Sequence, residues 1–213
     1  MNTDAVLTLT QWLSPGFPVG AFAYSHGLER VIDAGGITSV ATLEPWLRDI
    51  IRHGCGRSDL VLLRVAYDAG DEEVARIDAQ AQAFSASSGR LTETCDQGAA
   101  FSRTVDAVWD TRLGTLTYPV ALGRAAKLRG LPQDLTAAMY LHAFTANLIS
   151  AAVRLVPLGQ TEGQDLLARL APLITSIADA TAESTPDDLT SACFAADIAS
   201  MQHETQYSKV FRT

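Results

Sequence analysis

The segment SPGFPVGAFAYSHGLER, residues 14–30, places a hydroxyl beside an imidazole at Ser25 and His26, a pair that could serve nucleophilic catalysis. Adjacent side chains point apart on a helix, so these two groups cannot form a catalytic dyad by themselves. The motif GxSxG is absent around Ser25, and neither GxGxxG nor GxxxxGK[ST] occurs in the chain. We therefore interpret the segment as a turn stiffened by proline and glycine, with Ser25 as a helix N-cap and His26 as a surface or packing residue.

The histidines are the next candidates for chemistry, and none lies three or four residues from another: His26, His53, His142 and His203. His142 falls on an apolar helix face, so we expect a core residue. His53 and Cys55 form only a weak metal pattern. His203 and Glu204 are weak metal candidates too, since further ligands would have to come from elsewhere. No cofactor and no catalytic residue is expected.

Composition narrows the class of protein further. The 213 residues carry 16 Lys+Arg against 24 Asp+Glu, a net charge of −8 that disfavours nucleic acid and anionic membranes as partners. No apolar run is long enough for a membrane span and no signal peptide is recognisable, so we expect a cytoplasmic protein. The three cysteines lie outside any CxxC pattern and are expected to be small buried or half-buried apolar residues.

Apolar residues recur with a helical period almost throughout, and no alternating pattern predicts a strand. The expected fold is all-α: a single-domain bundle of about nine or ten helices over residues 1–201, followed by a flexible partner-binding tail over residues 202–213. Gly98 is expected to mark close helix packing. The predicted helices cover residues 7–13, 25–34, 42–53, 58–68, 71–85, 91–109, 118–129, 132–155, 163–180 and 186–201.

Four separated segments resemble the UreF family of urease accessory proteins. They are SPGFPVGAFAYSHGLE near the start, ETCDQGAAFSR at residues 93–103, RLVPLGQTEGQ at residues 154–164 and HETQYSKVFRT at the end. Their order matches the family over nearly the whole chain. Lys209 and Thr213 stand where Arg and Ser are expected, which leaves the chemistry of the tail intact.

The resemblance implies a non-catalytic, dimeric protein of urease maturation. It implies that the protein forms a complex with UreD (also called UreH) and the GTPase UreG, and that this complex acts on apo-urease during nickel insertion. The tail is carried over as the segment facing UreD, with the candidate residues Gln202, His203, Glu204, Gln206, Tyr207, Lys209, Phe211 and Arg212. The early segment is carried over as a surface for UreG, with the candidate residues Ser14, Pro15, Phe17, Pro18, Tyr24, Ser25, His26 and Glu29.

Two alternatives to a pure scaffold stay open. The protein could regulate GTP hydrolysis by UreG directly, with Arg30 or Arg103 supplied to the transition state. It could also bind nickel itself through His203 and Glu204.

Overall fold

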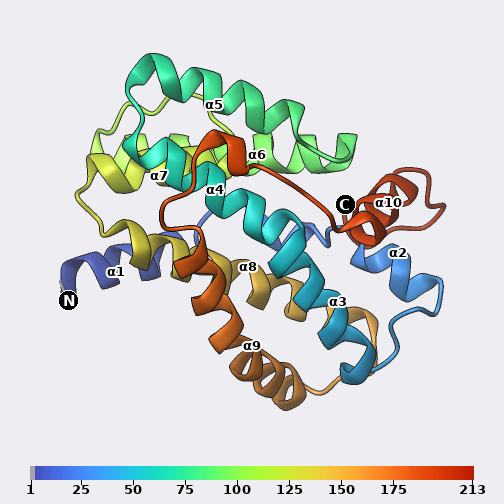
Figure 1. Cartoon of the computed structure of the whole chain (residues 1–213). Coiled ribbons are helices and arrows are strands. Elements are labelled where there is room, and N and C mark those ends of the chain that lie inside the picture. The colour runs from blue at the N-terminus through green and yellow to red at the C-terminus, as the bar shows by residue number, and fades with distance from the viewer. Residues whose placement is uncertain (1–2) are drawn as a thin grey trace.

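The computed structural model describes residues 3–213, which form ten α-helices, two short 3-10 turns and no strand (Figure 1). The all-α prediction is confirmed. The α-helices are α1 (Thr3–Trp12), α2 (Leu28–Asp33), α3 (Val40–His53), α4 (Cys55–Asp68), α5 (Asp71–Ala83), α6 (Ser88–Trp109), α7 (Tyr118–Leu128), α8 (Gln133–Leu155), α9 (Gln160–Ala180) and α10 (Phe194–His203). The 3-10 turns are η1 (Ala21–Ala23) and η2 (Pro186–Asp188).

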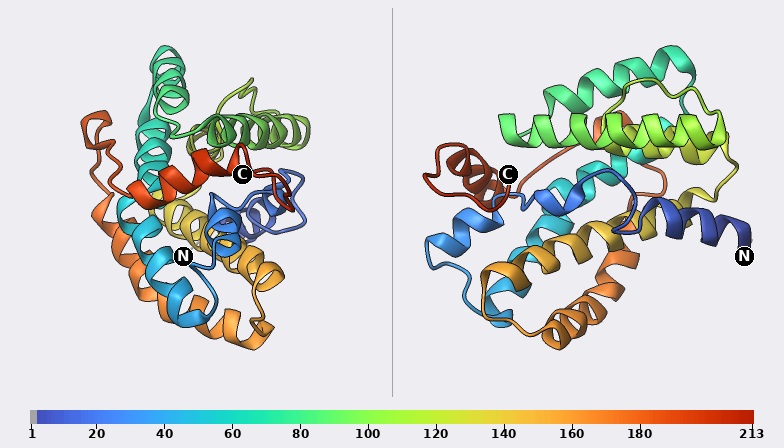
Figure 2. Two further views of the ribbon diagram at one scale, coloured as in Figure 1. Left: turned by 90° about the vertical axis from the view of Figure 1, so that its right-hand side faces the viewer. Right: turned by 180° about the vertical axis from the view of Figure 1, so that it is seen from behind.

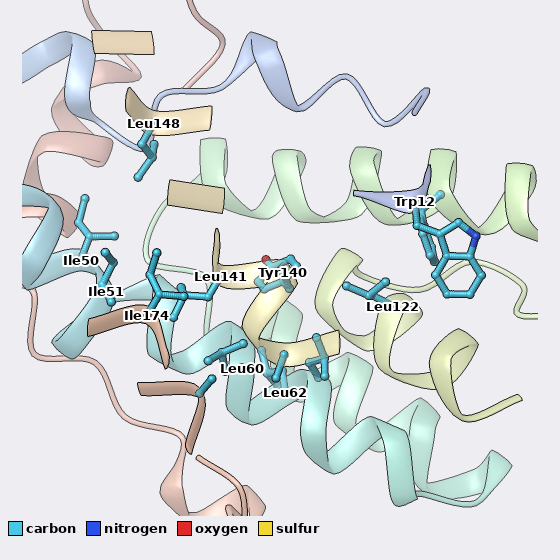
Figure 3. Packing of buried hydrophobic residues seen from close by; sticks show 14 of the residues in the cluster. Trp12, Ile50, Ile51, Leu60, Leu62, Leu122, Tyr140, Leu141, Leu148 and Ile174 are labelled. Atoms are coloured by element: carbon cyan, nitrogen blue, oxygen red, sulfur yellow. The ribbon is translucent and has the colours of Figure 1, made fainter. Parts of the chain in front are cut away.

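Helices α4 and α8 lie at the centre and carry the core. Helix α4 packs against α3, α5, α7 and α8, and α8 packs against α9, α2 and α3 as well. Leu60 and Leu63 on α4 and Leu141 on α8 are fully buried, and Figure 3 shows this layer from close by. Helices α2 and α10 lie together at one end of the molecule, and α1 lies at the other (Figures 1 and 2).

The predicted core stripe of helix α8 is confirmed only in part. It ran through Leu135, Met139, His142, Ala146, Ile149 and Val153. Ile149 is buried, His142 is exposed, and the other four are half-buried against the core. The most buried positions hold large residues such as Leu141 together with small ones such as Ala137, and the small residues allow neighbouring helices to approach closely. By length and composition α8 could cross a membrane, yet half of its apolar window is buried, and it is the core helix of this bundle.

The helix boundaries differ from prediction most clearly at both ends of the chain. Residues 186–201 do not form one helix, because the segment between η2 and α10 is extended and the Ala192 N–H donates to the His53 carbonyl at 2.8 Å. Helix α2 begins at Leu28 rather than Ser25, since His26 and Gly27 have positive φ angles of 55° and 76°. Tertiary contacts therefore override the local helical pattern at these two places.

Two helical glycines are required by close packing. A Cβ atom on Gly98 would lie 2.0 Å from the Leu116 carbonyl oxygen, which confirms the predicted close contact there. A Cβ atom on Gly123 of α7 would lie 2.1 Å from the Leu63 carbonyl oxygen of α4. Neither clash can be relieved by rotating a side chain, because the opposing atom belongs to the backbone.

We predict that Gly123→Ala lowers the free energy of unfolding by about 1–3 kcal/mol or more, since α7 must move away from α4. Urea denaturation measures the change. Gly70→Ala is the matched control, because Gly70 has an ordinary φ of −75° and no atom near its added Cβ. Equal stabilities of the two variants would contradict this close packing.

Candidate partner-binding site

The segment of residues 14–29, here called the junction segment, is anchored at one end by an aromatic side chain. Phe17 is buried with its ring centroid 5.6 Å from that of Phe101 on α6. The chain then turns through Gly20, forms η1, and passes Tyr24 in an extended conformation. At Gly27 it presses against α10, where a Cβ atom would lie 2.6 Å from the Ser200 nitrogen. Only glycine fits there, because its φ is also positive.

The tail, residues 202–213, is held by one buried carboxylate on α2. Glu29 accepts the backbone N–H groups of Val210 at 2.6 Å and Phe211 at 3.0 Å, and it lies 2.8 Å from Nε2 of His203. Glu29 and His203 are both almost fully buried. Burial alone would raise the pKa of Glu29, but His203 and the two N–H groups outweigh it and hold this pKa below its ordinary value. The carboxylate is therefore ionised and fully used in holding the tail.

Backbone and ring contacts complete the attachment. The Arg212 N–H donates to the Ala23 carbonyl at 2.7 Å, and the Ser25 N–H donates to the Thr213 carbonyl at 2.8 Å. The Ser25 hydroxyl donates to the same Thr213 oxygen. Phe211 is buried beneath the Arg154 guanidinium of α8, whose carbon lies 4.4 Å from the ring centroid. The junction segment and the tail thus form one continuous structure.

The prediction that the tail is flexible is wrong. Its apolar residues are sparse, as expected from the sequence, but the tail docks through backbone N–H groups and a buried carboxylate, which hydrophobic periodicity does not reveal. Phe211 and Thr213 are only 3% and 2% exposed.

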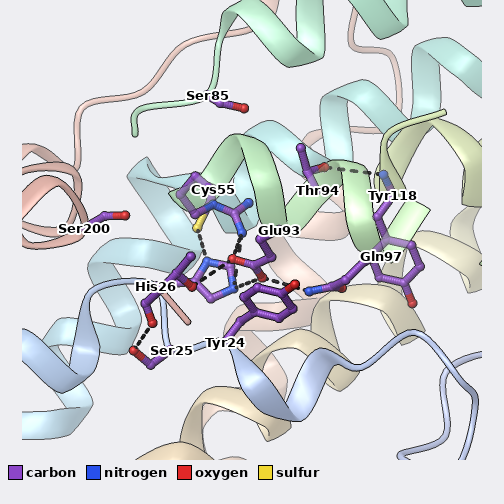
Figure 4. A network of polar contacts seen from close by, with 12 residues as sticks. Tyr24, Ser25, His26, Cys55, Ser85, Glu93, Thr94, Gln97, Tyr118 and Ser200 are labelled. Atoms are coloured by element: carbon purple, nitrogen blue, oxygen red, sulfur yellow. Dashed lines mark hydrogen bonds and ion pairs between the residues drawn. The ribbon is translucent and has the colours of Figure 1, made fainter. Parts of the chain in front are cut away.

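His26 is buried, which rules out the surface alternative and agrees with the packing alternative, since its ring centroid lies 4.8 Å from that of Phe144. Its Nε2 lies 2.9 Å from a Glu93 oxygen, and its Nδ1 lies 3.5 Å from the Cys55 sulfur (Figure 4). Arg90 binds the other Glu93 oxygen at 2.6 Å and approaches Asp59 at 3.7 Å. These five residues, His26, Cys55, Asp59, Arg90 and Glu93, are here called the Glu93 cluster.

Both carboxylates of the Glu93 cluster have partners inside it. Burial would raise the pKa of Glu93, yet Arg90 and His26 bring it down to about 2. Burial raises the pKa of the Asp59 carboxyl, opposed by Arg90 and by a 2.7 Å hydrogen bond from the Tyr140 hydroxyl. Burial also raises the pKa of the Cys55 thiol, which keeps it a poor nucleophile. The cluster therefore ties the junction segment to α4 and α6 and has no activated nucleophile.

Ser25 and His26 do not form a catalytic dyad, and residues 3–213 hold no metal site. The Ser25 hydroxyl faces Thr213 rather than an imidazole. His203 is buried against Glu29, whereas Glu204 is exposed and accepts the Ser88 N–H at 2.8 Å, so these two weak metal candidates point to different partners. No group of three His, Cys, Asp or Glu residues is placed to hold a metal ion in this part of the chain.

The candidate partner-binding residues divide by exposure. Those buried are Phe17, Tyr24, Ser25, His26, Glu29, His203 and Phe211. Those at least partly exposed are Ser14, Pro15, Pro18, Gln202, Glu204, Gln206, Tyr207, Lys209 and Arg212. Only the exposed residues can touch a partner directly, and the buried residues hold the exposed ones in position.

Exposed apolar residues lie in and beside these two segments. Phe22, which the sequence left as either packed or exposed for a partner, is 66% exposed in the junction segment. Val210, which the sequence did not single out, is 71% exposed in the tail. Helix α10 adds Phe194, Ile198 and Met201 on its outer side. Their spacing of four and three residues could have indicated one helix face, but periodicity alone assigns such a face to the core.

We predict that Glu29→Ala releases the tail while the helical body stays folded, because His203 and two backbone N–H groups lose their shared acceptor. Hydrogen exchange of the amides of residues 207–213 should speed up by about tenfold or more. Glu183→Ala is the control, since Glu183 is an exposed glutamate far along the chain. Unchanged exchange in Glu29→Ala would show that the carboxylate does not hold the tail.

Known proteins give the same assignment as the motifs. The UreF family profile matches residues 37–171. The chain is 64% identical over its full length to the urease accessory protein UreF of Roseobacter denitrificans, covering 96% of that protein. It is 52% identical to that of Ruegeria pomeroyi and 45% identical to that of Azorhizobium caulinodans, in each case with 98% of this chain and 96% of the relative covered. The chain therefore belongs to the UreF family of urease accessory proteins, which are non-catalytic factors of urease maturation.

Proposed function

We propose that this protein is a cytoplasmic scaffold that joins UreD (UreH) to the GTPase UreG, and through them serves apo-urease while nickel is inserted. The observation that carries the proposal is the docked tail, which turns Tyr207, Val210 and Arg212 outward while its other side is bound to the body. A tail held rigidly in this way presents a surface without the entropy cost of ordering it on binding.

The tail supports UreD as the partner at this end of the molecule. Tyr207 is fully exposed, and Tyr and Arg side chains are the residue types that anchor protein interfaces. The outer side of α10 is exposed and apolar as well, with Phe194, Ile198 and Met201. On this proposal the buried residues Glu29, His203 and Phe211 position the tail rather than touch UreD.

The junction segment supports a second partner surface, assigned here to UreG. Pro15, Gly16 and Pro18 are exposed in it, and Phe22, also exposed, is assigned to the dimer contact below. Because the junction segment is bonded to the tail through Ala23 and Ser25, the two surfaces are held in a fixed relation to each other. A scaffold requires such a relation between its two partners.

A direct effect on GTP hydrolysis is the second candidate function. Arg103 is exposed on α6, whereas Arg30 is engaged with Asp33 at 3.6 Å and Gln202 at 3.4 Å. An arginine supplied to a GTPase must be free to reach its transition state. Exposure therefore favours Arg103 over Arg30 for this role.

We predict that Tyr207→Ala combined with Val210→Ala weakens binding to UreD by about tenfold or more, because both side chains are exposed on the docked tail. Co-purification and interferometry with purified UreD measure the loss. Leu128→Ala, an exposed apolar residue on α7, is the control. Wild-type affinity in the tail variant would contradict the assignment of the tail to UreD.

We also propose that the protein is a homodimer that associates through the outer face of α8. A groove with a volume of about 590 Å³ runs along this face, with Met139, Ala146 and Val153 on one wall. Phe22 protrudes at the edge of the same groove. A projecting ring beside an apolar groove is self-complementary when two copies meet about a two-fold axis.

Light scattering should then give the mass of two chains for the wild type and of one chain for Ala146→Glu, because the new charge would be buried at the interface. Leu128→Glu, which changes an exposed residue outside the groove, should stay dimeric. A dimeric Ala146→Glu variant would remove α8 as the contact.

A further inference from the structure

A second cavity, with a volume of about 370 Å³, lies between α10 and the turn that joins α5 to α6. Phe84 and Ala86 line it from the turn, and Leu62 lines it from α4. The cavity is distinct from the groove on α8, although the Glu93 cluster contributes to the walls of both.

One face of α10 forms the outer wall of this cavity. Phe194, Asp197, Ile198 and Met201 follow one another at spacings of three, one and three residues, which places all four on one side of the helix. All four line the cavity. The three apolar side chains are 71%, 51% and 49% exposed, so this wall is open to a partner.

An acidic group lies in the middle of this apolar face. The Asp197 carboxylate is half-buried, and it accepts a 3.3 Å hydrogen bond from the Ser191 hydroxyl. Burial raises the pKa of Asp197, opposed by this hydrogen bond and by Arg90. Asp59 also lines the cavity.

Asp59 and Asp197 differ in their partners. Arg90 is the one Lys or Arg among the lining residues, and it lies 2.6 Å from Glu93 and 3.7 Å from Asp59. Asp59 therefore has a cationic partner, whereas the salt bridges described for residues 3–213 include none to Asp197. A cationic group entering from outside would meet the Asp197 carboxylate without a paired cation.

We propose that the groove between α10 and the α5–α6 turn is a docking site for a protein surface that presents a lysine or arginine within an apolar patch. The basic head pairs with Asp197, and its aliphatic stem lies along Phe194 and Ile198. The apolar rim excludes water from the pair, which strengthens it relative to an exposed ion pair. The proposal rests on the proposed function, with UreD as the protein that supplies this surface.

The test measures the affinity of the full-length chain for purified UreD by interferometry at two salt concentrations. Asp197→Lys should weaken binding by about tenfold or more, because like charges would face each other. Asp197→Asn should weaken binding less than Asp197→Lys does. When NaCl is raised from about 50 mM to about 500 mM, the affinity of Asp197→Asn for UreD should fall by a smaller factor than the affinity of the wild type. Asp187→Lys makes the same charge change at an exposed site in η2, and it should bind within about twofold of the wild type.

Thermal unfolding by circular dichroism first establishes that each variant is folded. If Asp197→Lys does not fold, the salt dependence of Asp197→Asn binding to UreD tests the docking site by itself. Wild-type affinity and wild-type salt dependence in Asp197→Asn would overturn the docking site. The double variant Tyr207→Ala and Val210→Ala separates this proposal from the proposed function. If the double variant loses affinity for UreD but the Asp197 variants do not, UreD binds the tail without this groove. If the double variant and the Asp197 variants all keep wild-type affinity, the assignment of UreD as the partner is wrong.

Discussion

The buried carboxylate of Glu29 is the group on which the packing of α2, α10 and the tail depends. It accepts two backbone N–H groups from the tail and pairs with His203 at the end of α10. A carboxylate left in this position without those donors would pay a large desolvation cost. The tail and α2 are therefore stable only together, and the shape of the exposed surface follows from that requirement.

The Glu93 cluster is a second buried carboxylate site, and it lies within the helical body. Four donors converge on Glu93, from His26, Arg90, Gln97 and Thr213. Each comes from a different part of the chain or a different turn of α6, so the cluster fixes the junction segment and the tail against α6 at once. The buried His, Arg and Glu side chains of this cluster, which are residue types common in active sites, here hold the junction segment and the tail in place.

This use of polar residues fits the family to which the chain belongs. A maturation factor that binds several proteins needs exposed apolar patches at fixed relative positions. The structure supplies three of them around a rigid helical core: the outer side of α10 with the tail, the exposed part of the junction segment, and the groove on α8. The outer side of α10 is also the wall of the groove between α10 and the α5–α6 turn. This patch differs from the other two in carrying the Asp197 carboxylate at its centre, and this charge is the basis for its proposed selectivity.

The sequence by itself determined the helical class, most helix positions, the close contact at Gly98 and the family, because periodicity, caps and motifs are local signals. The tertiary structure decided what local patterns cannot encode. The sparse apolar residues of the tail suggested flexibility, yet Glu29, distant in sequence, supplies its acceptor. His142, expected in the core, is exposed, and His26, for which the sequence left surface and packing open, is buried, since the face that a helix or turn presents to the core depends on what packs against it.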